Sequence, residues 1–165
     1  MEATGELVVR TAHDEVSAVW TAHYAPLAGW IASLVGDTET ARDMAAEAFT
    51  RLLGRWRRVD DPRGFLYVVA TNLVRDHWRR EERRRRATGR LHRERHPDAQ
   101  PAADPWLRDL VERLPDRFRD IVLLHYYADL PVAAVASAVG RPEGTVKREL
   151  SEARALLLAA IEATP

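Results

Sequence analysis

The fold is decided by one stretch, Gly140-Arg-Pro-Glu-Gly-Thr-Val-Lys-Arg-Glu-Leu150, which lies between two short segments with helical periodicity. Before it, apolar residues share one helical face, at Val132, Val135, Ala136 and Val139. Gly140 then permits the positive φ with which many helices end. After it, apolar residues again share one face, at Val146, Leu150, Ala153, Leu157 and Ile161. The stretch therefore predicts the turn and second helix of a helix-turn-helix.

The second helix of such a motif presents the side chains near its start to the major groove of DNA. Four side chains point outward there in this chain, namely Lys147, Arg148, Ser151 and Glu152. The pattern indicates DNA binding.

The composition is that of a globular protein, with 46% hydrophobic residues among 165. The chain has no cysteine, which excludes disulfides, thiol nucleophiles and cysteine-ligated zinc. The N-terminus lacks the pattern of a secretion signal. No stretch approaches the roughly 18 apolar residues of a membrane span. We therefore expect a soluble cytoplasmic protein without membrane insertion.

The net charge of zero conceals a strong pattern along the chain. Residues 1–50 have a net charge of −6, residues 51–95 a net charge of +9, and residues 96–165 a net charge of −3. The basic middle segment is rich in arginine, whose planar guanidinium suits contacts with phosphate and with guanine edges.

The periodicity predicts an all-α protein with two small helical domains, at residues 1–87 and 106–165, joined by a linker at residues 88–105. In the first domain we expect helices over residues 14–35, 38–56 and 62–86. Pro26 should break the first of these in two, because an interior proline loses a hydrogen bond and clashes with the preceding turn. Asp61 should cap the third, which opens with Pro62. In the second domain we expect helices over residues 106–114 and 115–129, followed by the helix-turn-helix.

Three separated motifs carry a family resemblance. The first is Gly36-Asp37 followed by Ala-Arg-Asp-Met-Ala-Ala-Glu-Ala-Phe at residues 41–49. The second is Asp-Pro-Arg-Gly-Phe-Leu-Tyr at residues 61–67, which leads into residues 70–80. The third runs from Leu114 to Lys147. With these motifs the chain resembles bacterial RNA polymerase sigma factors of the extracytoplasmic-function (ECF) group.

The resemblance implies a protein that binds core RNA polymerase and directs promoter-specific initiation, with no catalysis and no cofactor of its own. It implies that the N-terminal domain reads the −10 element and the C-terminal domain the −35 element. The implied partners are the clamp of the largest polymerase subunit, the flap of the second subunit, promoter DNA and an anti-sigma factor. The alternative is a stand-alone helix-turn-helix regulator, which would bind DNA without joining polymerase.

Candidate residues follow from the resemblance. Polymerase docking is expected at Asp43 and Glu47, whose i, i+4 spacing makes one acidic patch; the alternative is a solvated helix face. Contacts with −10 DNA are expected at Arg57, Arg58, Asp60, Arg63, Asn72, Arg75, Arg79, Arg80 and Arg83. The loop at residues 57–64 would hold a flipped base, with Asn72 beside it. The last four arginines form a basic stripe suited to phosphates, or else a solvated face partly neutralised by Glu81 and Glu82.

Contacts with −35 DNA are expected at Arg119, Arg141, Thr145, Lys147, Arg148, Ser151 and Glu152. Arg141 could equally serve only to flank the turn. Glu149 and Glu152 stand where the family often has basic residues. Glu152 could accept a hydrogen bond from cytosine or could pair with Arg148 at i, i+4.

Two further features are interpreted as structural. Trp56 and Trp78 are expected in the core rather than stacked on bases. His92 and His96 have the i, i+4 spacing of metal ligands on a helix, but they precede Pro97 without a third ligand and are assigned to the linker.

Overall fold

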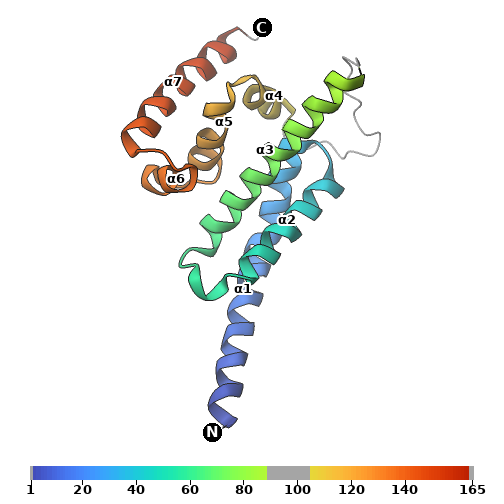
Figure 1. Ribbon diagram of the computed structural model, residues 1–165, viewed down its shortest axis with the longest axis vertical. Coiled ribbons are helices and arrows are strands. Elements are labelled where there is room, and N and C mark those ends of the chain that lie inside the picture. The colour runs from blue at the N-terminus through green and yellow to red at the C-terminus, as the bar shows by residue number, and fades with distance from the viewer. Residues whose placement is uncertain (1, 89–104, 164–165) are drawn as a thin grey trace.

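The computed structural model describes the backbone of residues 2–88 and 105–163, and the side chains of residues 13–87 and 109–163. Over these ranges the chain is helical, without a strand, and the predicted all-α class is confirmed. The helices are α1 (Glu2–Val35), α2 (Thr38–Leu53), η1 (Trp56–Arg58), α3 (Pro62–Thr88), α4 (Pro105–Arg113), α5 (Asp116–Val122), η2 (Leu123–Tyr127), α6 (Val132–Val139) and α7 (Glu143–Glu162) (Figure 1). None of the helices in the described part of the chain is long and apolar enough to cross a membrane.

Helices α1, α2 and α3 pack together around an apolar core. The core includes the fully buried Leu27, Ile31, Leu52, Leu66 and Val74. Local signals set the helix ends. Gly36 has a φ of 76°, which ends α1, and the Asp37 side chain accepts a hydrogen bond from the Thr40 amide at 2.8 Å, which caps α2.

Helix α1 runs unbroken through Pro26, so the predicted division into two helices is wrong. A proline at this position leaves the carbonyl of Ala22 without its helical partner. Both residues are exposed in α1, so water can satisfy that carbonyl and the ring meets no packed neighbour. The cost of an interior proline is therefore reduced here, and the packing of the second half of α1 on α2 and α3 keeps the helix continuous.

Helices α5, α6 and α7 enclose Phe118, Ile121, Val135, Val146 and Leu150. The predicted helix over residues 115–129 is regular only as far as Val122. It continues as the π-helix η2, in which the Ala128 amide donates to the Leu123 carbonyl, five residues back, at 3.0 Å. The turn between α6 and α7 is built on Gly140, whose φ is 66°, as predicted for a helix that ends in the left-handed region.

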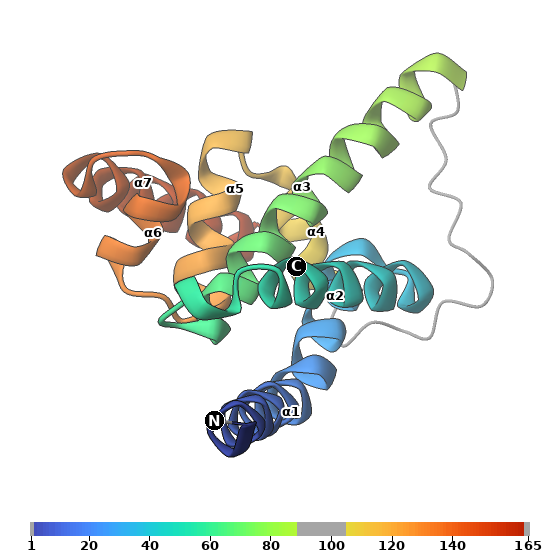
Figure 2. The ribbon, with the colours of Figure 1, turned by 60° about the horizontal axis from the view of Figure 1, so that its bottom comes forward.

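The two groups of helices touch. Helix α4 contacts α1, and both α5 and η2 contact α3 (Figure 2). The buried apolar residues of the two groups form one continuous cluster. Trp78 of α3 is buried and donates its indole N–H to the Leu34 carbonyl at 3.2 Å, which confirms its predicted place in the core. Trp56 is half-buried and packs against the same cluster.

The turn gives a first prediction. Replacing Gly140 by alanine should lower the free energy of unfolding by about 1 kcal/mol, because the added Cβ is disfavoured at a positive φ. The change in stability would report backbone strain alone, because that Cβ would meet no atom within 4 Å and so would cause no clash. Gly144, inside α7 and equally unobstructed, is the matched control. There the same change should stabilise the protein, by up to about 1 kcal/mol. Urea unfolding of both variants measures the difference, and equal effects at the two sites would contradict the assignment.

Candidate nucleic-acid interface and docking face

The predicted basic stripe on α3 consists of two parts with different surroundings. Arg79, Arg80 and Arg83 are exposed, and within the described side chains none of them forms an ion pair with a carboxylate. The final arginines of α3 are instead paired to Glu81 and Glu82 on their own helix, at 2.8–3.0 Å. The hydrogen bond from Arg86 holds the pKa of Glu82 below its usual value. The cations that remain available to phosphate are therefore those at 79, 80 and 83.

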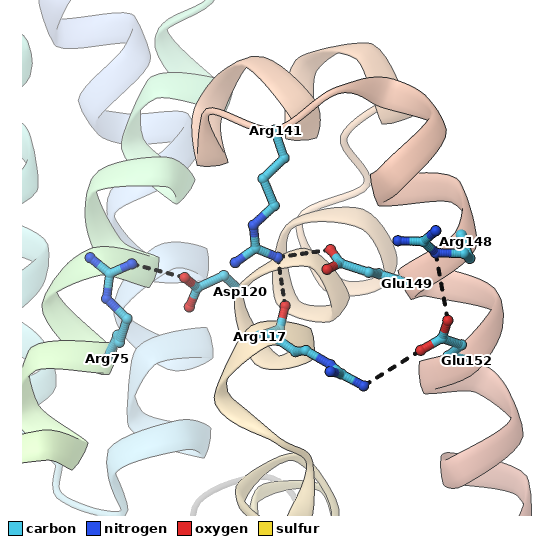
Figure 3. A network of polar contacts seen from close by, with 7 residues as sticks. All are labelled: Arg75, Arg117, Asp120, Arg141, Arg148, Glu149 and Glu152. Atoms are coloured by element: carbon cyan, nitrogen blue, oxygen red, sulfur yellow. Dashed lines mark hydrogen bonds and ion pairs between the residues drawn. The ribbon is translucent and has the colours of Figure 1, made fainter.

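Arg75 lies apart from this free group. Its guanidinium donates to the Asp120 carboxylate of α5 at 2.8 Å, and the side chains are 35% and 10% exposed (Figure 3). Arg119, predicted from the sequence as a −35 contact, lies at the same junction. It stacks over the Trp78 ring at 5.7 Å, pairs with Asp116 at 2.8 Å and donates to the Glu112 carbonyl. The structure thus places both arginines between the two groups of helices.

The other −10 candidates lie around the start of α3. Arg57, Arg58 and Asp60 are exposed on η1 and the loop that follows it. Asn72 lies further along α3 and is half-buried. Arg63 lies over the Tyr67 ring at 5.1 Å. Burial raises the pKa of Tyr67, and the charge of Arg63 partly opposes this. The first and last candidates on α3, Arg63 and Arg83, are about 30 Å apart along the helix, at 1.5 Å per residue, so they cannot form one compact site.

Asp61 caps α3, as the sequence predicts. Its Oδ1 accepts a hydrogen bond from the Gly64 amide at 3.0 Å. A Cβ on Gly64 would lie 2.3 Å from the other carboxylate oxygen, so a side chain here would push the Asp61 carboxylate out of its capping position. The cap therefore fixes the backbone where the loop of residues 57–64 enters α3.

The two acidic candidates lie on the exposed face of α2. Asp43 has no ion-pair partner among the side chains of residues 13–87 and 109–163, whereas Glu47 is paired with Arg51 at 2.8 Å. The buried side of the same helix carries Ala41, Met44, Ala45, Ala48, Phe49 and Leu52. Helical periodicity thus turns both carboxylates to the surface.

The second helix of the turn motif, α7, has the two faces that its sequence predicts as far as Ala153. Beyond it the predicted apolar face is not buried, because Leu157 is half-buried and Ile161 is 43% exposed. Val146, Leu150 and Ala153 are buried, while Lys147, Arg148, Ser151 and Glu152 are exposed and Thr145 is half-buried. Lys147 has no carboxylate partner in the described part of the structure. The exposed side chains follow directly after the turn at Gly140.

The two glutamates of α7 differ in their roles (Figure 3). The Glu149 side chain is 14% exposed, and its carboxylate accepts a hydrogen bond from Arg141 at 2.8 Å. The same Arg141 nitrogen donates to the Arg117 carbonyl at 2.8 Å, so this arginine joins the turn to α5 and α7. Glu152 is exposed and pairs with Arg148 at 3.7 Å and with Arg117 at 3.6 Å. The predicted pairing of Glu152 with Arg148 is present.

Sequence reasoning missed the partners that come from distant segments. These are Arg117, Asp120, Tyr126 and Arg154, which contact residues between 24 and 45 positions away. No local periodicity points to them. The expected linker and its His92 and His96 lie outside the described residues, apart from the ends, where α3 reaches Thr88 and α4 begins at Pro105. Elsewhere in the described residues, no group of three or more acidic or histidine side chains could hold a metal ion.

Comparison with known proteins matches the two halves to two regions of one family. The family model of sigma-70 region 2 matches residues 19–84, and that of sigma-70 region 4 matches residues 105–157. These are the segments that contain α3 with its arginines and the helix-turn-helix.

Relatives agree with the match. The chain is 34% identical over 156 residues to the probable ECF RNA polymerase sigma factor SigI of Mycobacterium tuberculosis, covering 86% of this chain and 54% of SigI. It thus spans about half the length of that relative. It is 31% identical over 129 residues to the RNA polymerase sigma-E factor of Streptomyces coelicolor, covering 75% of this chain and 73% of that protein.

Solved structures share the fold. The sigma factor RpoE of Bartonella quintana, in complex with the anti-sigma factor NepR, has a TM-score of 0.67 at 14% identity, covering 92% of this chain and 99% of that one. CnrH, in complex with the cytosolic domain of CnrY, has a TM-score of 0.67 at 18% identity, covering 96% and 97%.

The fold and the two matched regions define a protein of the sigma-70 type. The chain belongs to the ECF group of this RNA polymerase sigma factor family.

The Arg141–Glu149 bridge gives a second prediction. A double-mutant cycle of Arg141→Ala and Glu149→Ala should show a coupling energy of about 1–2 kcal/mol in urea unfolding, because both side chains are shielded from water. The same cycle at Arg148 and Glu152 is the control. Those side chains are 71% and 47% exposed, and their coupling should be about 0.5 kcal/mol or less. Similar couplings in the two cycles would show that Arg141 does not join the turn to its neighbours.

Proposed function

We propose that this protein is a sigma factor that binds core RNA polymerase and directs it to promoters with a characteristic −10 and −35 element. The observation that carries the proposal is the presence of regions 2 and 4 in one chain, each with exposed cations on a helix that its family model covers. The proposed domains are residues 1–87 and 106–165, with a linker at residues 88–105. The proposed site of action is the cytoplasm, and the protein itself performs no catalysis.

The N-terminal domain would act on the −10 element through the two ends of α3. Free arginines at 79, 80 and 83 are suited to backbone phosphates, because each such contact releases counterions without reading a base. The loop at residues 57–64 and the amide of Asn72 would hold an unstacked base, since an amide can both donate and accept hydrogen bonds. The exposure of Arg57, Arg58 and Asp60 supports this role.

The C-terminal domain would read the −35 element with the start of α7. Lys147, Arg148 and Ser151 are exposed there, and Thr145 is half-buried beside them. Arg148 shares its charge with Glu152, so its direction is partly set before DNA arrives. Arg141 is held inside the motif, and any phosphate contact by this residue would use the nitrogens that do not bond to Glu149.

Docking on polymerase would use the acidic face of α2 at Asp43 and Glu47 against the basic clamp of the largest subunit. The flap of the second subunit would hold the C-terminal domain. An anti-sigma factor is a further proposed partner. RpoE and CnrH, which share the fold, were solved in complex with NepR and with the cytosolic domain of CnrY.

Use of Arg75 in promoter binding would require a change at the junction. Its guanidinium is engaged by Asp120, so a DNA phosphate would have to replace that carboxylate. The exchange conserves the charge pairing of Arg75 but leaves Asp120 without its partner. In this arrangement of the helices, promoter contacts therefore begin at residues 79–83, and Arg75 can join only after α3 and α5 separate.

A stand-alone helix-turn-helix regulator is not favoured, because region 2 matches the N-terminal half of the chain and such a regulator has no need of it. Run-off transcription with purified core polymerase on a random promoter library separates the two functions. A sigma factor directs initiation at a shared set of sites. A regulator binds DNA alone and yields no initiation, and that result would overturn the proposal.

The acidic face gives a third prediction. Replacing both Asp43 and Glu47 by lysine should weaken binding to core polymerase by about tenfold or more, because like charges would then meet across the interface. Binding of a −35 duplex should not change. The control is the double replacement of Asp14 and Glu15 by lysine, which makes the same change of charge on the exposed part of α1. Equal losses in both variants, measured by competition for fluorescent core polymerase, would reject a specific docking role.

The arginine stripe gives a fourth prediction. Replacing Arg79 and Arg80 by alanine should weaken promoter binding almost equally for all sequences. It should also reduce the slope of log affinity against log salt by roughly 2, as two phosphate contacts are lost. The control is Arg84→Ala with Arg86→Ala, because those arginines already pair with Glu81 and Glu82. Fluorescence anisotropy of the holoenzyme on labelled promoter DNA measures both. An unchanged slope in the Arg79 and Arg80 variant would reject their role.

A further inference from the structure

A small open hollow of about 280 Å³ lies between η2 and α7. Its apolar lining comes from Val132 and Leu150, and its polar lining includes Tyr126, Lys147 and Arg154. No carboxylate lines it within the described residues. The hollow therefore combines an apolar wall with groups that donate hydrogen bonds and carry positive charge.

Tyr126 and Arg154 form a preset pair at this hollow. The phenol oxygen accepts two hydrogen bonds from the guanidinium, from Nε at 3.1 Å and from Nη2 at 2.8 Å. A phenol that accepts two N–H groups still has its own proton to donate. Nothing in the described part of the chain accepts that proton. The pair thus presents an O–H donor beside a guanidinium that is already ordered, which reduces the entropy lost when a ligand binds.

The surrounding chain holds Tyr126 in this position. Tyr126 lies in the π-helix η2, and π-helical turns are often found at functional sites. The neighbouring His125 ring meets the Tyr126 ring edge-on at 4.9 Å, and its Nδ1 lies 2.8 Å from the Leu130 carbonyl. Since one ring nitrogen is bonded to the backbone, the imidazole is fixed and braces the tyrosine.

The donors lie in a line along α7. Lys147, Ser151 and Arg154 are at i, i+4 and i+7, which places them on one face of the helix. All three line the hollow, and all three are exposed. An ammonium, a guanidinium and hydroxyls that converge without a carboxylate match a tetrahedral oxyanion with several acceptor oxygens.

We propose that this hollow is a phosphate-binding site, in which Tyr126, Lys147, Ser151 and Arg154 hold a backbone phosphate of the DNA read by α7. This inference rests on the proposed function, because the duplex is the source of the phosphate. It adds Tyr126 and Arg154 to the DNA-binding residues and assigns them to positioning the helix, since a phosphate contact carries no sequence information. Of the candidates at the start of α7, Thr145 and Arg148 would be left to read the bases, while Lys147 and Ser151 would contact the phosphate.

The test uses the full chain and a short duplex of mixed sequence. Tyr126→Phe keeps the ring but removes the hydroxyl, and Arg154→Gln removes the charge. Arg113→Gln, an exposed arginine on α4 outside the hollow, is the matched control. We expect Arg154→Gln to reduce the salt slope of duplex binding by about 1 and Tyr126→Phe to weaken binding several-fold. Base preference should not change, and neither should thermal unfolding for Tyr126→Phe. An unchanged slope in Arg154→Gln together with unchanged affinity in Tyr126→Phe would overturn the proposal.

A second arm separates the source of the phosphate. Titration with inorganic phosphate, followed by the NMR signal of the Arg154 Nε–H, should give saturable shifts that Tyr126→Phe weakens. If inorganic phosphate binds at the hollow but neither Tyr126→Phe nor Arg154→Gln changes duplex binding, the assignment of the site to DNA is overturned.

Run-off transcription by the variants keeps the two proposals distinct. If wild-type protein directs initiation while both variants bind duplex normally, the phosphate site fails and the proposed function stands. If wild-type protein does not initiate, the proposed function fails and the duplex titration still tests the hollow.

Discussion

The ion pair between Arg75 and Asp120 is the constraint on which the arrangement of the two groups of helices depends. Asp120 is one of few polar residues buried in the described part of the chain, and a buried carboxylate without a partner is strongly disfavoured. Within the described residues its cation comes from α3, so α5 is held against α3 as long as the pair persists. The apolar cluster that runs across the junction adds burial but little direction, whereas the ion pair fixes which turn of α3 faces which turn of α5.

The same requirement explains how a chain with zero net charge can expose cations for DNA. Arginines at 75, 119 and 141 are engaged by carboxylates or carbonyls of neighbouring helices, and those near the end of α3 are paired along their own helix. Several acidic residues are thus taken up by these ion pairs. Along α3 and α7, the exposed cations without a carboxylate partner in the described part of the chain include Arg79, Arg80, Arg83 and Lys147. Local charge, rather than the total, decides where an anionic polymer is attracted.

Sequence periodicity predicted the features that depend on neighbours within a few residues. The two faces of the first half of α7, the cap at Asp61 and the left-handed turn at Gly140 are all present. The predicted break at Pro26 is wrong. The free energy that an interior proline costs depends on whether it is exposed, and a single sequence does not reveal exposure. The pairs of Asp120 and Tyr126 join segments 45 and 28 residues apart, for which periodicity holds no signal. The residues that touch polymerase and promoter stay predictions from the family resemblance and from exposure.

Glu149 and Glu152 of α7 stand where the family often has basic residues, and their contacts show why they need not oppose DNA binding. Glu149 is turned into the motif, where it neutralises Arg141 and ties the turn to α5; at 14% exposure it contributes little charge to the surface. Glu152 lies on the exposed face, but it is shared between Arg148 and Arg117, so that cluster of three has a net charge of +1. A glutamate held by two arginines is poorly placed to repel phosphate. The proposed base contacts at this face would therefore have a donor in Arg148 and an acceptor in Glu152 side by side.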